Sequence, residues 1–327
     1  MGIILNKKIF LTIAVLIILV SVGVIAIFGL KSGIDFTGGS LTEVHYSTLP
    51  EKSEVEAAIA PLNLGTVAVR ASESEAGKGY LITTRSLIES ERKTLESNLQ
   101  GIGKDGNITQ FTSIGPVIGQ ELKDKAVWAI GAVLVLIICY VAFAFSGIGK
   151  PVSSWIYGFT TIAVLGHDIL LPVAFMSLYG HYTGAQVDVL FITALLTVLG
   201  FSVNDTIVIF DRIREKLQHN RTESRKNIPV PGGKDHVEIT YKLTRPFGEL
   251  VDEAINETMT RSINTSLTVL LALVALYFFG SSVTHTFVLT LMVGVVFGAY
   301  SSIFIASPLL VVYQEWLAKR EEQNKKS

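Results

Sequence analysis

The chain has 327 residues, of which 49% are hydrophobic and only 17% charged, and its mean hydropathy is +0.49. This composition excludes an ordinary soluble domain and indicates a polytopic membrane protein. The net charge of −1 gives no sign of a nucleic-acid partner. The single Cys139 excludes a disulfide framework and a zinc site, and no GxxxxGK[ST] nucleotide motif occurs. We therefore expect no cofactor and no metal.

Six apolar runs are each long enough to cross a bilayer, which takes about 20 helical residues. The first run follows Asn6-Lys7-Lys8 and resembles a signal peptide at first sight. Its apolar stretch of about 22 residues exceeds the usual 7–15, however, and no small-residue cleavage site follows it, so we predict an uncleaved anchor. The predicted transmembrane helices cover roughly 9–30, 126–148, 152–178, 187–210, 263–279 and 286–313.

Lysine and arginine are unevenly distributed between the predicted loops. They occur in the N-terminal residues 1–8, the segment 211–262 and the tail 314–327, whereas the loops 180–186 and 280–285 contain none. Because cytoplasmic loops of membrane proteins carry the excess of positive charge, the first three segments are predicted to lie in the cytoplasm. Both termini are therefore expected on the cytoplasmic side.

Residues 31–125, between the first and second spans, then form one extracytoplasmic domain. Its apolar patterns alternate in the order β-α-β-β-α-β, which is typical of a small ferredoxin-like α+β unit. We find no histidine–carboxylate cluster and no nucleophile–base pair in this domain. The predicted strands are 41–46, 66–71, 80–84 and 107–112, and the predicted helices are 51–60 and 87–99.

The cytoplasmic segment 211–262 is unusually long. Its middle, 221–245, is highly charged and holds a proline- and glycine-rich stretch at 228–233, which is typical of a mobile excursion or a small hairpin. After Pro246, apolar residues recur at helical spacing with four carboxylates on the opposite face. This pattern predicts an amphipathic helix at 247–259 that leads into the fifth span and lies along the cytoplasmic membrane surface.

Asp205 lies inside the predicted fourth span. A carboxylate at the centre of a membrane helix costs about 2.5–3.5 kcal/mol on insertion scales, and a helix can cross the bilayer without one. A carboxylate in a membrane helix usually belongs to a proton or ion path. Arg261 opens the predicted fifth span, and at 1.5 Å per residue both side chains lie about 27 Å from the outer ends of their helices. Asp205 and Arg261 can therefore face each other, although a lone arginine there can also extend to the membrane surface.

Other polar residues accompany these two. Asn204 belongs to a stripe of small and polar residues on the fourth span, and Arg261 begins a similar stripe with Asn264 or Thr265. Such residues allow membrane helices to pack closely, which explains the threonines and glycines but not Asp205. The glycines and serines of 294–302 in the last span predict another close-packing face, to which we assign no chemistry.

The third span holds a second candidate site, His167-Asp168. One interpretation is a hydrogen-bonded structural pair. The other is a titratable element of a proton relay, because histidine changes charge near neutral pH. A glycine-rich loop at 33–40 follows the first span, but no strand precedes it and it faces outside. We therefore predict a tight turn there and not a phosphate site.

Four motifs follow one another along the chain: Gly33–Gly39, Gly200–Thr206, Phe210–Glu215 and Arg261–Ser266. In this order they closely resemble the SecF family, and the resemblance covers nearly the whole chain. SecF is the smaller partner of the SecD–SecF protein-export complex, in the resistance–nodulation–division superfamily. The resemblance implies a role in proton conduction for Asp205 and Arg261, with Asn204, His167 and Asp168 beside them. It also marks Asp35, Gly38, Gly39, Asp211, Arg212, Asn264 and Thr265 as family-motif residues.

The resemblance also implies a function and a location. The family uses the proton-motive force to assist late steps of protein export, together with SecD, the SecYEG channel and SecA. YajC and YidC are further expected partners, and the exported polypeptide is the cargo. The expected location is the bacterial inner membrane or an internal membrane. The connection between the fourth and fifth spans is longer than is usual in the family, around 221–245.

Two other classes of function are alternatives that the sequence leaves open. A half-size exporter of small molecules or lipids belongs to the same superfamily, but such exporters carry two large outer domains and twice as many spans. An intramembrane aspartyl enzyme requires two carboxylates, which Asp168 and Asp205 provide. Neither lies in a GxGD motif, and counting places them at different depths. An enzyme is therefore not expected.

Overall fold

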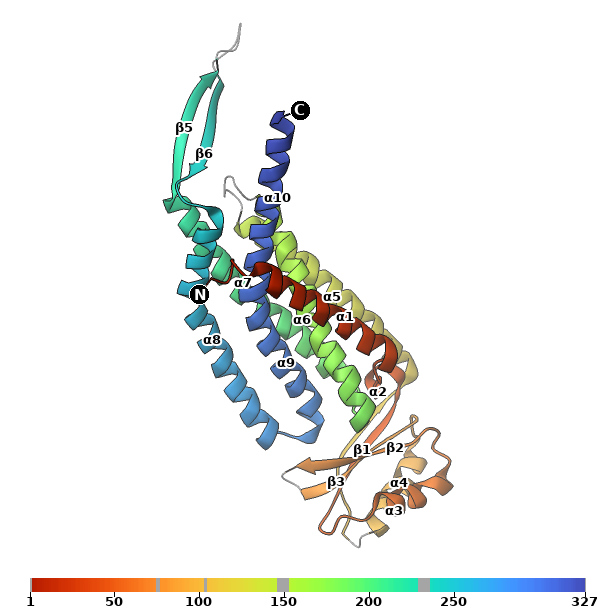
Figure 1. Cartoon of the computed structure of the whole chain (residues 1–327). Helices are drawn as coiled ribbons and strands as arrows, with labels where there is room; N and C mark the ends of the chain where they lie inside the picture. Colours follow the sequence, from red (N-terminus) through yellow and green to blue (C-terminus); the bar gives the residue numbers. More distant parts are fainter. Residues whose placement is uncertain (1, 75–76, 103–104, 146–152, 229–235, 327) are drawn as a thin grey trace.

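The computed structural model describes residues 2–74, 77–102, 105–145, 153–228 and 236–326. Long helices form a bundle with a small α/β domain at one end and a two-stranded hairpin at the other (Figure 1). We call these the domain end and the hairpin end of the bundle. In the described part of the chain, six helices are long and apolar enough to cross a membrane. The prediction of a polytopic α-helical membrane protein is therefore confirmed.

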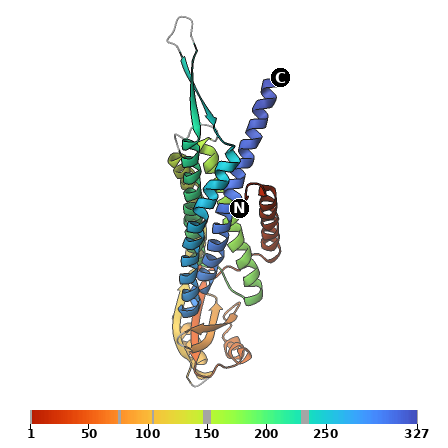
Figure 2. The ribbon, with the colours of Figure 1, turned by 60° about the vertical axis from the view of Figure 1, so that its left-hand side comes forward.

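The bundle helices extend beyond the apolar runs that predict them, because their polar ends continue as helix outside the hydrocarbon layer. The fifth helix of the chain, for example, starts ten residues before the predicted second span, at a proline that suits the first turn of a helix. Helix α1 stands at the edge of the bundle, against α6 (Figure 2). The helices are α1 (Lys7–Phe28), α5 (Pro116–Ala144), α6 (Ser154–Thr183), α7 (Val189–His219), α8 (Phe247–Phe279) and α9 (His285–Ser301), which continues through a π-helix (Ser302–Ala306) into α10 (Ser307–Lys326).

The α/β domain is ferredoxin-like, as predicted. Its four antiparallel strands lie in the order β2-β3-β1-β4. Helices α3 and α4 supply Val55, Ile59, Leu95 and Leu99 to a core that also buries apolar side chains of the sheet. The elements are α2 (Ile34–Thr37), β1 (Gly39–Tyr46), α3 (Lys52–Ile59), a 3-10 turn (Ala60–Leu62), β2 (Ala68–Ser74), β3 (Gly77–Thr84), α4 (Glu89–Ile102) and β4 (Asn107–Ile114).

The excursion between α7 and α8 forms a hairpin. Strand β5 (Arg221–Ile228) pairs antiparallel with β6 (His236–Leu243), in a register that joins the first residue of one strand to the last of the other. The proline- and glycine-rich stretch predicted at 228–233 lies, apart from its first residue, outside the described residues. The hairpin extends away from the bundle (Figure 1).

The predicted amphipathic helix at 247–259 differs from the structure in one respect. It leads into the fifth span, as predicted, since it is the first part of α8, which runs unbroken to Phe279, but its apolar face is not turned to the membrane surface. Its apolar residues Leu250, Val251, Ala254 and Ile255 are fully buried against α7, the N-terminal residues and α10. Because protein covers this face, the helix has no need to lie on lipid, and nothing breaks it before the membrane.

The two adjacent glycines that lead into β1 have little room for a side chain. Gly39 has φ of +141°, and a Cβ there would lie 2.5 Å from the carbonyl oxygen of Thr84. We expect Gly39→Ala to destabilise the protein by roughly 1–3 kcal/mol, the usual cost of a strained backbone. Gly101→Ala is the matched control, because its Cβ would meet nothing within 4 Å and alanine favours helix. Thermal unfolding of the purified variants measures both; equal Tm values would contradict the expected strain.

Candidate functional site

Asp205 lies on α7, past its middle toward the hairpin end, and its side chain is buried. Its Oδ2 has no hydrogen-bond partner in the described part of the chain. Arg261 and Ser266 of α8 are the polar side chains that face the carboxylate. A charged carboxylate with an unpaired oxygen is costly in a membrane interior. The position therefore favours either protonation or a further partner.

Arg261 acts on Asp205 electrostatically but does not contact it. Within the ranges that the structure describes, the two side chains are not within the 4.0 Å that defines an ion pair. The Arg261 side chain is exposed at the surface of the single chain, as are Asn204 and Asn264. Asp205 and Arg261 thus lie on neighbouring helices, at the similar depth that counting predicts. Because no ion pair among the described residues holds them together, the attraction between them depends on the charge of Asp205.

The polar stripes of α7 and α8 differ in how well their groups are satisfied. The threonine hydroxyls donate to carbonyl oxygens of their own helices, for example Thr197 to Thr193 O at 2.8 Å and Thr265 to Arg261 O at 2.9 Å. Threonine side chains can therefore face lipid or another helix at little cost. The amides of Asn204 and Asn264 have no such internal acceptor among the described residues. They are the groups that need a partner outside this chain.

Behind Asp205 lies a fully buried polar network around Asp168. Its carboxylate accepts hydrogen bonds from the hydroxyl of Ser202 on α7 and from that of Ser301 on α9, the latter at 2.8 Å. The Nδ1 of His167 lies 2.9 Å from Asp168 Oδ1, and the Nε2 of His167 is buried without a partner among the described residues. The network thus ties α6 to α7 and α9.

A second polar contact runs parallel to this network. The hydroxyls of Thr206 and Ser302 lie 2.9 Å apart, where the π-helix begins. The hydrogen bonds of Ser202, Ser301 and Ser302 were not predicted from the sequence, because serine in a membrane helix also suits close packing. Close packing is present as well: a Cβ on Gly298 would lie 3.2 Å from Ser202 Cβ. The signal that was available is the spacing of Ser202, one turn before Asp205 on the same helix.

The remaining motif residues lie at the two ends of the bundle. At the hairpin end Asp211 is exposed, and Arg212 donates to Glu257 at 2.5 Å and also to Glu215. The pair with Glu257 joins α7 to α8, whereas the pair with Glu215 lies within α7. At the domain end, Asp35 lies in the short helix α2, Gly38 follows it and Gly39 begins β1. We call residues 31–39 the loop that enters β1. The predicted site residues therefore form three groups: one in the middle of the bundle, one at the hairpin end and one at the domain end.

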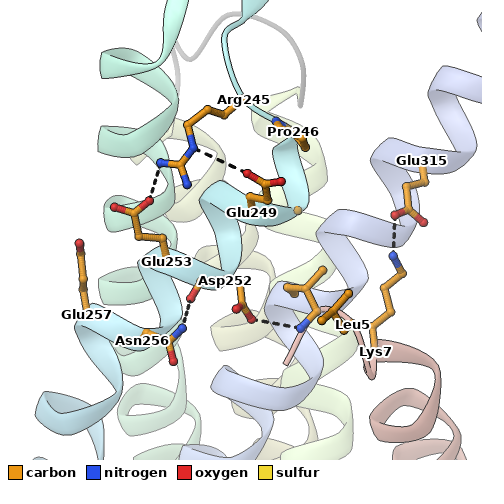
Figure 3. Close-up of a pocket in the computed structure, with 12 residues that line it drawn as sticks. Leu5, Lys7, Arg245, Pro246, Glu249, Asp252, Glu253, Asn256, Glu257 and Glu315 are labelled. Atoms are coloured by element: carbon orange, nitrogen blue, oxygen red, sulfur yellow. Dashed lines mark hydrogen bonds and ion pairs between the residues drawn. The ribbon is translucent and has the colours of Figure 1, made fainter. Parts of the chain in front are cut away.

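A large groove among the described residues lies at the hairpin end, and Asp205 does not line it. Its volume is about 810 Å³, and the start of α8, the N-terminal residues and α10 line it (Figure 3). Arg245 bridges Glu249 at 3.7 Å and Glu253 at 2.8 Å, and Lys7 pairs with Glu315 at 2.5 Å. The pair of Lys7 and Glu315 joins the start of α1 to α10, and the amide of Ile4 donates to Asp252 of α8 at 3.2 Å. No group of three metal-ligating side chains occurs among the described residues.

Family models match most of the chain. The family described as "Protein export membrane protein SecD/SecF, C-terminal" matches residues 94–230 and 234–316. The family described as "SecD/SecF GG Motif" matches residues 23–48, which include the two glycines at the start of β1. The matched residues thus cover both the membrane bundle and the loop at the domain end.

Two relatives and one solved structure illustrate what this chain is similar to over most of its length. The protein translocase subunit SecF of Thermobaculum terrenum is 35% identical over 93% of this chain and 91% of its own length. That of Anaerolinea thermophila is 36% identical over 95% and 94%. The crystal structure of SecDF from Thermus thermophilus, a translocon-associated membrane protein, matches with a TM-score of 0.78 and 29% identity. This chain covers 38% of that longer chain, and the match covers 95% of this one.

Six membrane-spanning helices in the described ranges, with a buried carboxylate opposite an arginine and a ferredoxin-like domain at one end, define the class of a multi-pass membrane protein. With the relatives above, the chain belongs to the SecF family of protein translocase subunits. It is an accessory subunit of the Sec protein translocase and not an enzyme. A half-size exporter of small molecules or lipids is not favoured, because the relatives are translocase subunits.

Proposed function

We propose that this chain acts with SecD to couple the proton-motive force to late steps of protein export, with Asp168 as one residue of the proton path. The observation that carries the proposal is Asp205, a buried carboxylate in a membrane helix with one oxygen unpaired among the described residues. Protonation removes the charge and with it the cost of burying it. A proton that crosses 100 mV releases about 2.3 kcal/mol, enough to shift a conformational equilibrium about fifty-fold.

Protonation of Asp205 changes the packing of two helices. The neutral side chain loses its attraction to Arg261, so α7 and α8 no longer hold the same spacing. Both helices extend to the domain end, and their shift moves the α/β domain against the exported chain. Asn204, His167 and Asp168 complete the path in this proposal. His167 and Asp168 lie behind Asp205 and hold α7 in place while its charge changes.

The proposed location is the bacterial cell membrane, with the hairpin end and both termini in the cytoplasm. The lysines and arginines before the first span, between the fourth and fifth spans, and in the tail support this orientation. The α/β domain then lies outside, where late export takes place. A proton entering from the outside reaches Asp205 after moving about half the length of α7.

The exposed polar face of α7 and α8 is the proposed contact with SecD. Asn204, Arg261 and Asn264 are exposed on this chain alone and sit at membrane depth. Uncovered amides and a guanidinium in hydrocarbon are costly. Helices of SecD that carry polar side chains satisfy them and complete the surroundings of Asp205. SecYEG, SecA, YajC and YidC are the wider partners in this proposal.

We expect Asn204→Trp to weaken the association with SecD, because an indole ring on this face keeps the two subunits' helices apart. Val135→Trp places the same ring on an exposed position of α5 and is the matched control. Purification in mild detergent measures how much SecD accompanies each variant. We expect about a ten-fold loss for Asn204→Trp, which corresponds to about 1.4 kcal/mol. Equal recovery of SecD with both variants would place the contact elsewhere.

Export into vesicles tests the function as a whole. Vesicles that contain SecYEG and the SecD–SecF complex receive a precursor protein with SecA and ATP, with and without an imposed proton gradient. The gradient is expected to accelerate the late phase of export, and a protonophore is expected to reduce the rate to that of vesicles without this chain. Acceleration that survives the protonophore would contradict the proposal.

A further inference from the structure

The loop that carries the two adjacent glycines is bonded to the chain segment that precedes α7. The amide of Val187 donates to Lys31 O at 2.8 Å, and the amide of Gly33 donates to Val187 O at 2.8 Å. Ser32 and Val187 form a parallel bridge. Residues just after the first span and just before the fourth are therefore held together at the domain end.

Asp35 continues this connection into the first turn of α7. Its Oδ2 accepts a hydrogen bond from the amide of Val189, the first residue of α7, at 2.9 Å. Asp188 accepts from the amide of Phe191 at 2.9 Å. The first amides of a helix have no partner within the helix, and carboxylates there are favoured by the helix dipole. The helix that carries Asp205 thus has one cap of its own and a second from a remote loop.

The loop that supplies Asp35 cannot move independently of the α/β domain. A Cβ on Gly38 would lie 2.7 Å from Pro116 Cα, at the start of α5, and Gly39 is the first residue of β1. On the other side, a Cβ on Gly119 of α5 would lie 2.8 Å from the amide nitrogen of Gly38. Such close backbone contacts leave no room for the loop to move relative to α5. Asp35 is therefore fixed to the sheet and to α5 at once.

Arg70 makes a second connection between the sheet and α7. It lies on β2, its Nε is buried without a partner in the described ranges, and it faces Asp188 and Tyr179. A Cβ on Gly184, in the loop before α7, would lie 3.4 Å from Arg70 Cδ. Burial lowers the pKa of Arg70 and raises the pKa of Asp188, and the attraction between the two charges opposes both shifts. The pair adds an electrostatic contact to the backbone bonds.

We propose that Asp35 is a positioning residue that transmits a displacement of α7 to the α/β domain. α7 is one unbroken helix, so a shift at Asp205 reaches Val189, about 24 Å away at 1.5 Å per residue. The bond from Val189 to Asp35 then moves the loop, and the loop moves β1. This inference rests on the proposed function, in which Asp205 is the group that changes charge.

Two pairs of spin labels separate the membrane half of the motion from the domain half. Cys139 is the only cysteine, so Cys139→Ser gives a background in which labels can be placed. Labels at Glu56 of α3 and Tyr182 of α6 report the domain against the bundle. Labels at Gln218 of α7 and Glu322 of α10 report the hairpin end; all four positions are exposed. The complex with SecD is measured in proteoliposomes with and without an imposed proton gradient.

In the parent protein, both distances are expected to shift when the gradient is applied. In Asp35→Ala, the shift at the hairpin end remains, the shift of the domain falls to the part that the Val187 backbone bonds and Arg70 still transmit, and gradient-driven export falls at least about five-fold. Asp35→Asn keeps both shifts and the export rate, because its amide oxygen still accepts from Val189. If Asp35→Ala does not assemble with SecD, Asp35→Ser replaces it, since its side chain is one bond shorter than the aspartate.

Each other outcome overturns the inference in a distinct way. Both shifts retained in Asp35→Ala would show that the domain follows α7 without Asp35, and would leave the proposed function intact. Both shifts lost in Asp35→Ala would show that Asp35 acts on the membrane helices themselves. No gradient-dependent shift in the parent would contradict the proposed function and this inference together. Loss in Asp35→Asn as well would assign the effect to the charge and not to the cap.

Discussion

Asp205→Asn is expected to leave the complex with SecD assembled and to abolish the acceleration of export by a proton gradient. Asparagine has the shape of the protonated side chain but cannot release a proton, so it holds the helices in one arrangement. The acceleration should fall to the gradient-free rate, a loss of up to about fifty-fold if the full 2.3 kcal/mol per 100 mV is used. Export into vesicles, with and without the gradient, measures this loss.

Asp124→Asn is the matched control for this change. Asp124 is an exposed residue of α5 whose carboxylate accepts a hydrogen bond from Gln120 on its own helix, at 3.0 Å. The same loss of one negative charge there should leave the acceleration unchanged. Normal gradient-driven export in Asp205→Asn would exclude Asp205 as the group that changes protonation. Loss of SecD from the purified complex would show instead that Asp205 has a role in assembly.

Asp168→Ala is expected to have the largest effect on stability. The substitution removes the common acceptor of three buried donors, on Ser202, Ser301 and His167. Buried donors that lose their partner destabilise a protein by about 1–3 kcal/mol each, and by less in membranes, where other partners can be found. We expect a total loss of about 2–4 kcal/mol. Thermal unfolding of the purified complex, followed by a probe of the membrane helices, measures it.

Asp168→Asn distinguishes hydrogen bonding from charge at this position. The amide oxygen still accepts from the two serines, so most of the stability should be retained. Because the proposed proton path includes Asp168, Asp168→Asn is expected to reduce gradient-driven export while the Tm stays near that of the parent. Equal Tm values for Asp168→Ala and the parent would contradict the view that this network ties α6 to α7 and α9.

The sequence predicted the parts of the fold that depend on local patterns. Apolar runs gave the spans, and alternating strands and helices gave the ferredoxin-like order, because both patterns follow from the periods of helix and strand. The ends were less well predicted: polar residues continue α5 and α7 beyond the membrane. The burial of 250–255 against other helices also could not be predicted, since amphipathic spacing looks the same whether protein or lipid covers the apolar face.

The candidate site was predicted in part, for a similar reason. Asp205 stood out because a carboxylate is rare in an apolar run, and Arg261 matched it by simple counting along two helices. The donors around Asp168 come from three helices, and no local pattern joins Ser202 to Ser301. The bond from Val189 to Asp35 joins residues 154 positions apart, and the glycine-rich loop was predicted only as a tight turn. Contacts of this kind depend on tertiary packing.

The central claim, that Asp205 binds and releases the proton, is tested most directly by infrared difference spectroscopy. The complex with SecD is titrated in membranes, and the carbonyl stretch of a protonated carboxylic acid is followed. The parent and Asp168→Asn are expected to share one titrating acid band that is absent from Asp205→Asn. A band that persists unchanged in Asp205→Asn would show that another group carries the proton and would contradict the account.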